Sequence, residues 1–248
     1  MFKKIIFCSL IATCLIFCFS FVLAEETEEG LEITVEELDI EKPGIFSWFM
    51  NAIDTVQIWI TRDPIKKSEL ELKKASRQLV KAREFVQNNA DDENLQNRFN
   101  QIDEKYQGFI NRINNRIQQL KEEDSNSDEF KNFLDKYTNH QLKHQEILQK
   151  LEEQVPEAVM EKIQEKRQEH LEKFGEVMSK LQNREEFKER LSNILNNTRQ
   201  RVESRARIMN TIEELEETVE EGIKGAIQEL KQQSTQQGLE QGNQKGKN

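Results

Sequence analysis

The sequence predicts an all-α protein whose long helices pair as antiparallel hairpins in an elongated, coiled-coil-like bundle. Helix breakers are scarce, because residues 45 to 221 contain only two glycines and two prolines. Apolar residues recur at alternating steps of three and four, which is the spacing of a helix that packs on one face. No stretch alternates β-branched and polar residues over the length of a strand.

Composition narrows the class of protein further. The chain has 248 residues, of which 35% are hydrophobic, and its formal net charge is −10. Globular domains usually contain about 45 to 50% apolar residues, so this chain has enough to line helical stripes but little for a thick core. An α/β enzyme is therefore not expected.

Residues 1–24 predict a secretory signal peptide. A short cationic start is followed by an almost wholly apolar run, and small residues precede Glu25. The three cysteines, Cys8, Cys14 and Cys18, all lie in this segment, so the mature chain would have no disulfide and no thiolate zinc site. We expect a secreted protein in the periplasm, at the cell surface or outside the cell. A retained N-terminal membrane anchor is the alternative.

The chain after the signal peptide begins with an acidic leader, residues 25–43, which has nine acidic residues and one lysine. The next segment, which opens the helical hairpin domain expected over 44–155, is the most apolar part of the mature chain and contains Trp48, Phe49 and Trp59. It could fill the groove between the helices that follow or lie flat on a membrane surface. The groove is favoured, because residues 45 to 60 lack the lysines that an interfacial helix uses against anionic lipid.

Helix boundaries can be placed from capping residues. Asp63 and Pro64 predict a helix start, since aspartate caps free amides and proline has no amide to lose. Two helices of roughly 26 and 30 residues should form the first hairpin. A third helix is expected next, and its row of apolar residues is interrupted by two polar residues, Gln141 and His144. Pro156 then either starts a fourth helix or kinks a continuous one. Further long helices are expected over 156–233, followed by a disordered tail, 234–248.

Several motifs resemble a bacterial secreted or surface-exposed helical domain known only as a domain of unknown function. They are the acidic lead-in, Pro43-Gly44, an aromatic helix, and the run Asp63-Pro64-Ile65-Lys66-Lys67-Ser68-Glu69-Leu70-Glu71-Leu72. The stretches 144–148 and 155–157 are similar to a later helix of that family and its proline break. The resemblance covers about residues 30 to 175. It implies a helical module of the cell envelope and supplies no catalytic residue.

The candidate ligand site of the sequence is formed by histidines. His140 and His144 are four residues apart, a spacing that can bring two imidazoles to one zinc or copper ion. His170 on the next helix, or Glu146, could supply a third ligand. The alternative is that His144 is a hydrogen-bonded polar layer of the seam with His140 at its edge, in which case the protein has no cofactor.

The remaining charged and polar patterns favour a non-catalytic protein. No phosphate-binding loop, nucleophilic serine motif or redox motif occurs. A basic block around residues 199–207 precedes an acidic block at 213–221, and an acidic exported chain is a poor match for nucleic acid. We expect these blocks to pair with a neighbouring helix or a second copy. The sequence thus predicts a protein-binding or spacer module of the envelope, with peripheral membrane contact through Trp48 and Trp59 as a further possibility.

Overall fold

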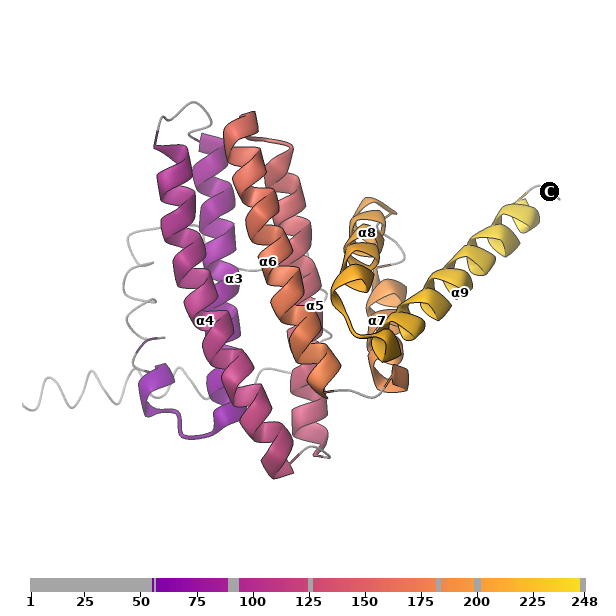
Figure 1. Ribbon diagram of the computed structural model, residues 1–248, viewed down its shortest axis with the longest axis horizontal. Helices are drawn as coiled ribbons and strands as arrows, with labels where there is room; N and C mark the ends of the chain where they lie inside the picture. The colour runs from indigo at the N-terminus through magenta and orange to yellow at the C-terminus, as the bar shows by residue number, and fades with distance from the viewer. Residues whose placement is uncertain are drawn as a thin grey trace, which may run out of the picture. The chain divides into compact units, whose positions relative to one another are not determined.

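The computed structural model describes residues 55, 57–88, 94–124, 127–181, 184–198 and 202–245, with side chains up to residue 234. Every regular element in these ranges is an α-helix, so the predicted all-α class is confirmed (Figure 1). The predicted signal peptide, the acidic leader, Trp48 and Phe49 lie outside the described residues. All the described residues belong to one compact unit, which starts at Ile33.

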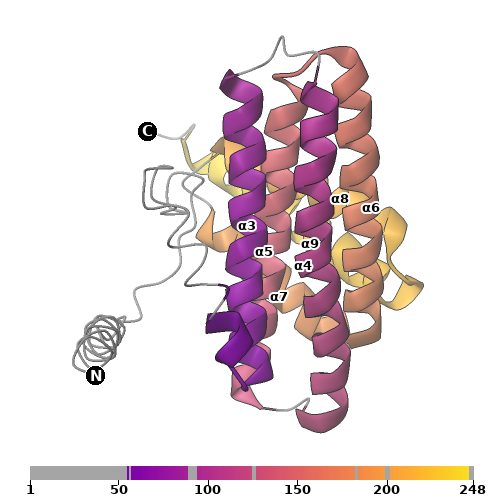
Figure 2. The ribbon, with the colours of Figure 1, turned by 90° about the vertical axis from the view of Figure 1, so that its left-hand side faces the viewer.

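Four long helices form an up-and-down bundle. They are α3 (Pro64–Asn88), α4 (Leu95–Asp124), α5 (Asp128–Glu152) and α6 (Glu157–Leu181), and they run alternately in opposite directions (Figures 1 and 2). The first two have 25 and 30 residues, close to the predicted lengths. Helix α6 packs on α4 and α5. The domain boundary expected after residue 155 therefore falls inside this bundle.

The helix starts follow the predicted capping chemistry. The Asp63 carboxylate accepts hydrogen bonds from the amides of Ile65 at 2.8 Å and Lys66 at 3.2 Å. The Ser127 hydroxyl accepts from the amide of Phe130 at the start of α5. The Pro156 carbonyl accepts from the amide of Val159 at 2.9 Å. Pro156 therefore precedes a separate helix rather than kinking a continuous one.

Three further helices follow the bundle. Helices α7 (Arg184–Asn197) and α8 (Val202–Thr218) pack on α5, and α9 (Glu221–Lys245) packs on both of them. The predicted disordered tail needs correction, because α9 continues as a helix to Lys245. The residues past 233 include glutamines, which favour helix, but also Gly238 and Gly242, which disfavour it, so helix propensity does not explain this extension.

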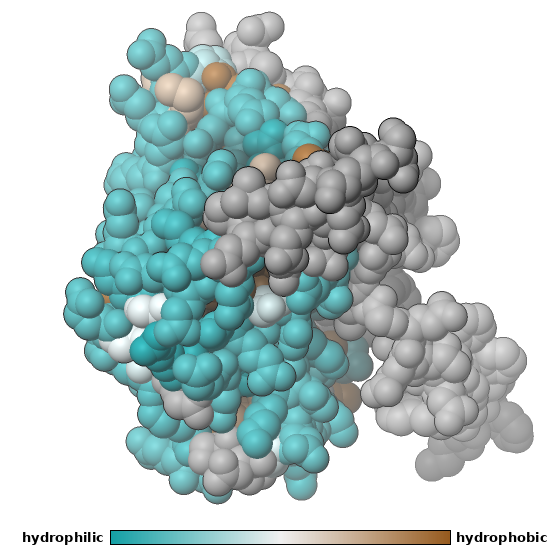
Figure 3. Space-filling view, turned by 90° about the vertical axis from the view of Figure 1, so that its right-hand side faces the viewer, coloured by the Kyte–Doolittle hydropathy of each residue, from teal (hydrophilic) through white to brown (hydrophobic). Residues whose placement is uncertain are grey.

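The interior is one connected apolar cluster with α5 at its centre. Buried apolar residues from α3 through α9 belong to the same cluster. Residues 141 to 149 of α5 are all buried, because α5 contacts α3, α6, α7 and α8. The described residues that are visible in Figure 3 are mostly hydrophilic. In the described ranges, no helix has both the length and the hydropathy needed to cross a membrane.

Candidate functional site: a buried histidine cluster

The helical bundle contains polar side chains from all four of its helices at one level. We call this group the histidine cluster. On each helix these residues lie on the inward face, where a polar residue interrupts the row of apolar residues. The members are Ser76 from α3, Asp103 and Tyr106 from α4, His140, Gln141 and His144 from α5, and His170 from α6.

The Ser76 hydroxyl joins two of the histidines. Its oxygen lies 3.0 Å from Nδ1 of His140, 2.8 Å from Nε2 of His144 and 3.0 Å from the carbonyl oxygen of Leu72. The carbonyl can only accept, so the single hydroxyl proton goes to Leu72. Both imidazoles must then donate to the Ser76 oxygen. This fixes Nε2 of His144 as its protonated nitrogen.

Tyr106 completes the hydrogen bonding of His144. Its hydroxyl lies 2.9 Å from Nδ1 of His144, the nitrogen left unprotonated by the contact with Ser76. Tyr106 therefore donates, and both ring nitrogens of His144 are occupied. The Tyr106 hydroxyl also lies 3.4 Å from the side-chain carbonyl of Gln141, a weaker contact.

His170 stacks on the Tyr106 ring. The two rings are stacked with their centroids 4.6 Å apart, and Nε2 of His170 lies 3.0 Å from a carboxylate oxygen of Asp103. Nδ1 of His170 is buried and has no hydrogen-bond partner among the described residues. The Asp103 contact orients the imidazole, and Nε2 is the donor because a carboxylate oxygen accepts.

Burial keeps the central groups uncharged. It lowers the pKa of His140 to about 4, with a smaller contribution from Lys136. Burial also lowers the pKa of His144 well below its usual value, and His140 and His170 lower it further. The pKa of Tyr106 is raised well above its usual value, again mainly by burial. His140, His144 and Tyr106 are therefore neutral near pH 7.

The structure brings the three predicted ligand histidines into one cluster. It does not aim them at a common point, because no group of three or more His, Cys, Asp or Glu side chains in the described ranges is arranged to hold a metal ion. Both nitrogens of His144 are already hydrogen-bonded. Glu146, the other predicted third ligand, bonds to Lys143 and Ser204 instead.

The partners of the histidines, Ser76, Asp103 and Tyr106, were not predicted from the sequence. Ser76 follows Ala75 on the buried side of α3, where a small polar residue could have marked a contact with a histidine. Such a signal is weak, because small residues also occur wherever helices pack closely.

A second polar group ties α8 to α5. The Lys143 ammonium lies 3.2 Å from a carboxylate oxygen of Glu146 and 3.2 Å from the Ser204 hydroxyl, which donates to Glu146 at 2.9 Å. Lys143 and Glu146 are only 5% and 2% exposed. Burial acts to raise the pKa of Glu146, but Lys143, Ser204 and Lys150 outweigh it and hold the pKa below its usual value.

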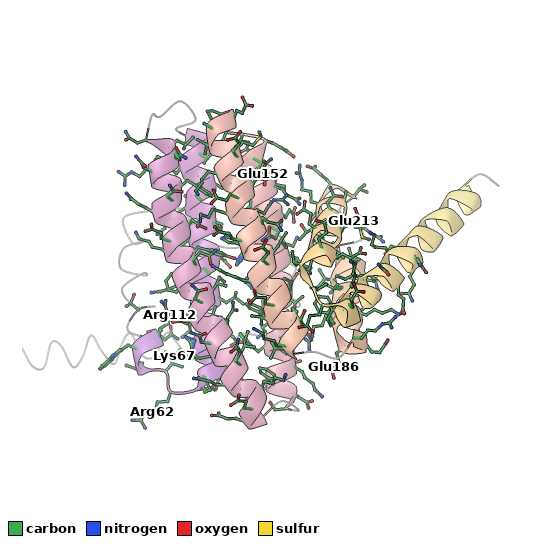
Figure 4. The ribbon with its side chains drawn as sticks, viewed as in Figure 1. Arg62, Lys67, Arg112, Glu152, Glu186 and Glu213 are labelled. Carbon is green, nitrogen blue, oxygen red and sulfur yellow. The ribbon has the colours of Figure 1, made fainter. Side chains whose placement is uncertain are left out.

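Some charged side chains of the basic and acidic blocks form ion pairs within the chain. Arg207 of the basic block contacts Glu153 at 2.7 Å and Glu203 at 2.9 Å. Glu214 of the acidic block contacts Arg167 at 2.7 Å. Many charged side chains surround the helices in Figure 4. Arg207 and Glu214 therefore pair with residues of neighbouring segments, as expected for the basic and acidic blocks.

Trp59 does not fill a groove. Its side chain is 84% exposed, and that of Ile60 is 55% exposed. The groove-packing prediction therefore does not hold for Trp59, although it was based on the whole apolar segment, most of which lies outside the described residues.

Comparisons of the chain with family models, with curated proteins and with solved structures found no match.

Proposed function

We propose that this chain is a non-catalytic helical module of the bacterial cell envelope that binds other proteins or spaces them. The observation that carries the proposal is the placement of its chemically capable groups. Ser76, Tyr106 and His144 are buried and hydrogen-bonded to one another across three helices. Groups used in this way stabilise and specify the packing of a bundle, and they are not available to a substrate.

The outer surface supports the same function. The described residues that are visible in Figure 3 are mostly hydrophilic, and the surface carries many acidic and basic side chains. Mixed charges of this kind favour specific contacts with proteins of complementary pattern, because like charges brought together cost free energy. The signal peptide expected at residues 1–24 would deliver such a module to the envelope.

The test is crosslinking of the tagged full chain in intact cells, followed by purification. We expect one or a few envelope proteins to be captured reproducibly. The matched control is Leu148→Asp, which buries a charge at a fully buried position and should abolish folding and capture together. Light scattering of the purified chain identifies self-association. Turnover of a small compound by the pure protein, with no captured partner, would contradict the proposal.

Metal binding is the second candidate, favoured by the gathering of His140, His144 and His170 in one cluster. Zinc or copper binding would require His144 to give up its hydrogen bonds to Ser76 and Tyr106, so the cluster would have to rearrange. Measuring the zinc and copper content of the purified chain tests whether the histidine cluster binds metal. Stoichiometric metal that is lost in His140→Ala and His170→Ala would favour this candidate, and a melting temperature unchanged by zinc and copper would exclude it.

A further inference from the structure

Three large apolar side chains are exposed among the described residues: Trp59 at 84%, Ile60 at 55% and Val202 at 81%. Val202 stands alone at the start of α8. Trp59 and Ile60 are adjacent, and they end the most apolar segment of the mature sequence. A tryptophan left almost fully in water forgoes a large favourable burial, so an exposed pair of this kind calls for a partner surface.

The Trp59–Ile60 pair sits on a defined turn. Residues 57–60 form a helical turn, and Thr61 bonds the carbonyl of Gln57 through its amide at 2.9 Å and its hydroxyl at 2.6 Å. Lys74 of α3 donates to the Thr55 hydroxyl at 2.6 Å. Asp63 then caps α3. The exposed pair is thus attached directly to the start of the bundle.

Cations lie next to the pair in a chain that is otherwise acidic. Residues 62–67 contain Arg62, Lys66 and Lys67 against Asp63 alone, whereas the whole chain has a net charge of −10. Arg62 is exposed, and so is the side chain of Lys66, at 67%, with its ammonium 3.6 Å from the Asp63 carboxylate. Figure 4 shows Arg62 and Lys67 at the same end of the bundle. The lysines missing from residues 45–60 are therefore supplied by the first turn of α3.

We propose that Trp59 and Ile60, together with Arg62 and Lys66, make a peripheral contact with an anionic lipid surface. An indole prefers the boundary between acyl chains and headgroups, because its ring is apolar and its N–H is polar. Neighbouring cations add attraction to anionic headgroups. A second copy is a poorer occupant, because joining the same surface of two chains would bring Arg62 and Lys66 of both chains together, and like charges repel.

Flotation with lipid vesicles tests the proposal. Residues 25–248 are used because residues 1–24 are apolar enough to bind lipid alone, and the compact unit holding every described residue starts at Ile33. Phosphatidylcholine vesicles with 30% phosphatidylglycerol should recover at least about tenfold more protein than phosphatidylcholine vesicles alone. Raising the salt to 0.5 M should weaken the binding severalfold, because salt screens the cationic contribution.

Three variants distinguish binding through this surface from nonspecific lipid binding. Trp59→Ala and the double variant Arg62→Gln with Lys66→Gln should each lower the bound fraction at least about fivefold. Val202→Ala is the matched control, since it removes an equally exposed apolar side chain elsewhere and should leave binding unchanged. Circular dichroism confirms that each variant is folded. Equal binding by Trp59→Ala and the unaltered chain, or no binding by either, would overturn the proposal.

Fluorescence gives a second and direct readout. The chain has two tryptophans, so Trp48→Phe leaves Trp59 as the only one. Anionic vesicles should shift its emission to shorter wavelength, and brominated lipid should quench it. A shift that appears with rising protein concentration and no vesicles would show a second copy as the occupant. Emission that stays at the wavelength of exposed tryptophan in bound protein would also refute the contact.

Discussion

Ser76 is the residue through which α3 and α5 share hydrogen bonds. Replacing it with alanine removes the oxygen that accepts from both His140 and His144. Ser76→Ala should lower the free energy of unfolding by about 2 kcal/mol, because buried donors lose their acceptor. Denaturant titration measures the change. Thr138→Val is the control, since the buried Thr138 hydroxyl bonds the carbonyl of Leu134 in its own helix and otherwise meets the weakly accepting sulfur of Met178 at 3.9 Å, so its loss should cost less than about 1 kcal/mol. Equal effects would mean that the bridge between helices adds nothing.

Acid sensitivity is a second consequence of the same residues. His140 has a pKa of about 4 in the folded protein, mainly because of burial, whereas an unfolded histidine titrates near 6.5. Above pH 6.5 both states are neutral. Below it the unfolded state takes up a proton that the folded state cannot, so stability falls until about pH 4, by up to about 3 kcal/mol.

This pH dependence can be separated from that of the carboxylates. The pKa of Glu146 is below its usual value of 4.5, so its contribution to stability is fully present above about pH 4.5 and is lost only as the pH falls further. Unfolding free energies measured between pH 7 and 5 should therefore decline in the unaltered chain and decline less in His140→Asn. Because burial also lowers the pKa of His144, some decline should remain in that variant. A profile that is flat between pH 7 and 5 would contradict the assignment of neutral buried histidines.

At the scale of the helices, two glycines in similar sequence settings should behave in opposite ways. A methyl group at Gly175 of α6 would lie 2.7 Å from the hydroxyl oxygen of Thr218 and 3.3 Å from its carbonyl oxygen at the end of α8. At Gly108 of α4 the nearest atom is 3.7 Å away, on the flexible side chain of Arg112. Glycine inside a helix costs about 0.5 to 1 kcal/mol relative to alanine.

Gly108→Ala should therefore raise the melting temperature, while Gly175→Ala should lower it, because α6 and α8 would have to separate slightly. Thermal unfolding followed by circular dichroism measures both. If Gly175→Ala were as stabilising as Gly108→Ala, the close approach of α6 and α8 would be refuted.

The helices themselves could be predicted from the sequence to a large extent. Asp63 and Pro64 mark the start of α3, and Pro156 marks the break before α6, because both act through local backbone chemistry. The extension of α9 to Lys245 was missed, since an apolar stripe was taken as the condition for a helix. Residues 234–245 contain Gly238 and Gly242, so nothing in their local composition predicts the extension.

At the scale of the whole molecule, the partners of the polar side chains could not be predicted. Ser76 meets His144 across 68 positions of the sequence, and Lys143 meets Ser204 across 61. A seam pattern shows that His144 faces inward but not which helix it meets. The placement of α6 in the bundle with α3 to α5 is of the same kind, because it depends on the way the helices pack and not on a local signal.

The buried pair of Lys143 and Glu146 should decide how firmly α8 is joined to the bundle. Glu146→Gln leaves the Lys143 ammonium buried without its counter-charge, and its other partner is the Ser204 hydroxyl of α8. We expect a loss of about 3 to 5 kcal/mol in the free energy of unfolding. The double variant Lys143→Met with Glu146→Gln removes the charge as well and should recover most of that loss.

Because the apolar cluster is continuous from α3 to α9, unfolding of the unaltered chain should be a single transition in denaturant. In Glu146→Gln, hydrogen exchange should quicken in α8 before it does in α3 and α4. Uniform exchange in all helices would show instead that the pair does not control the attachment of α8.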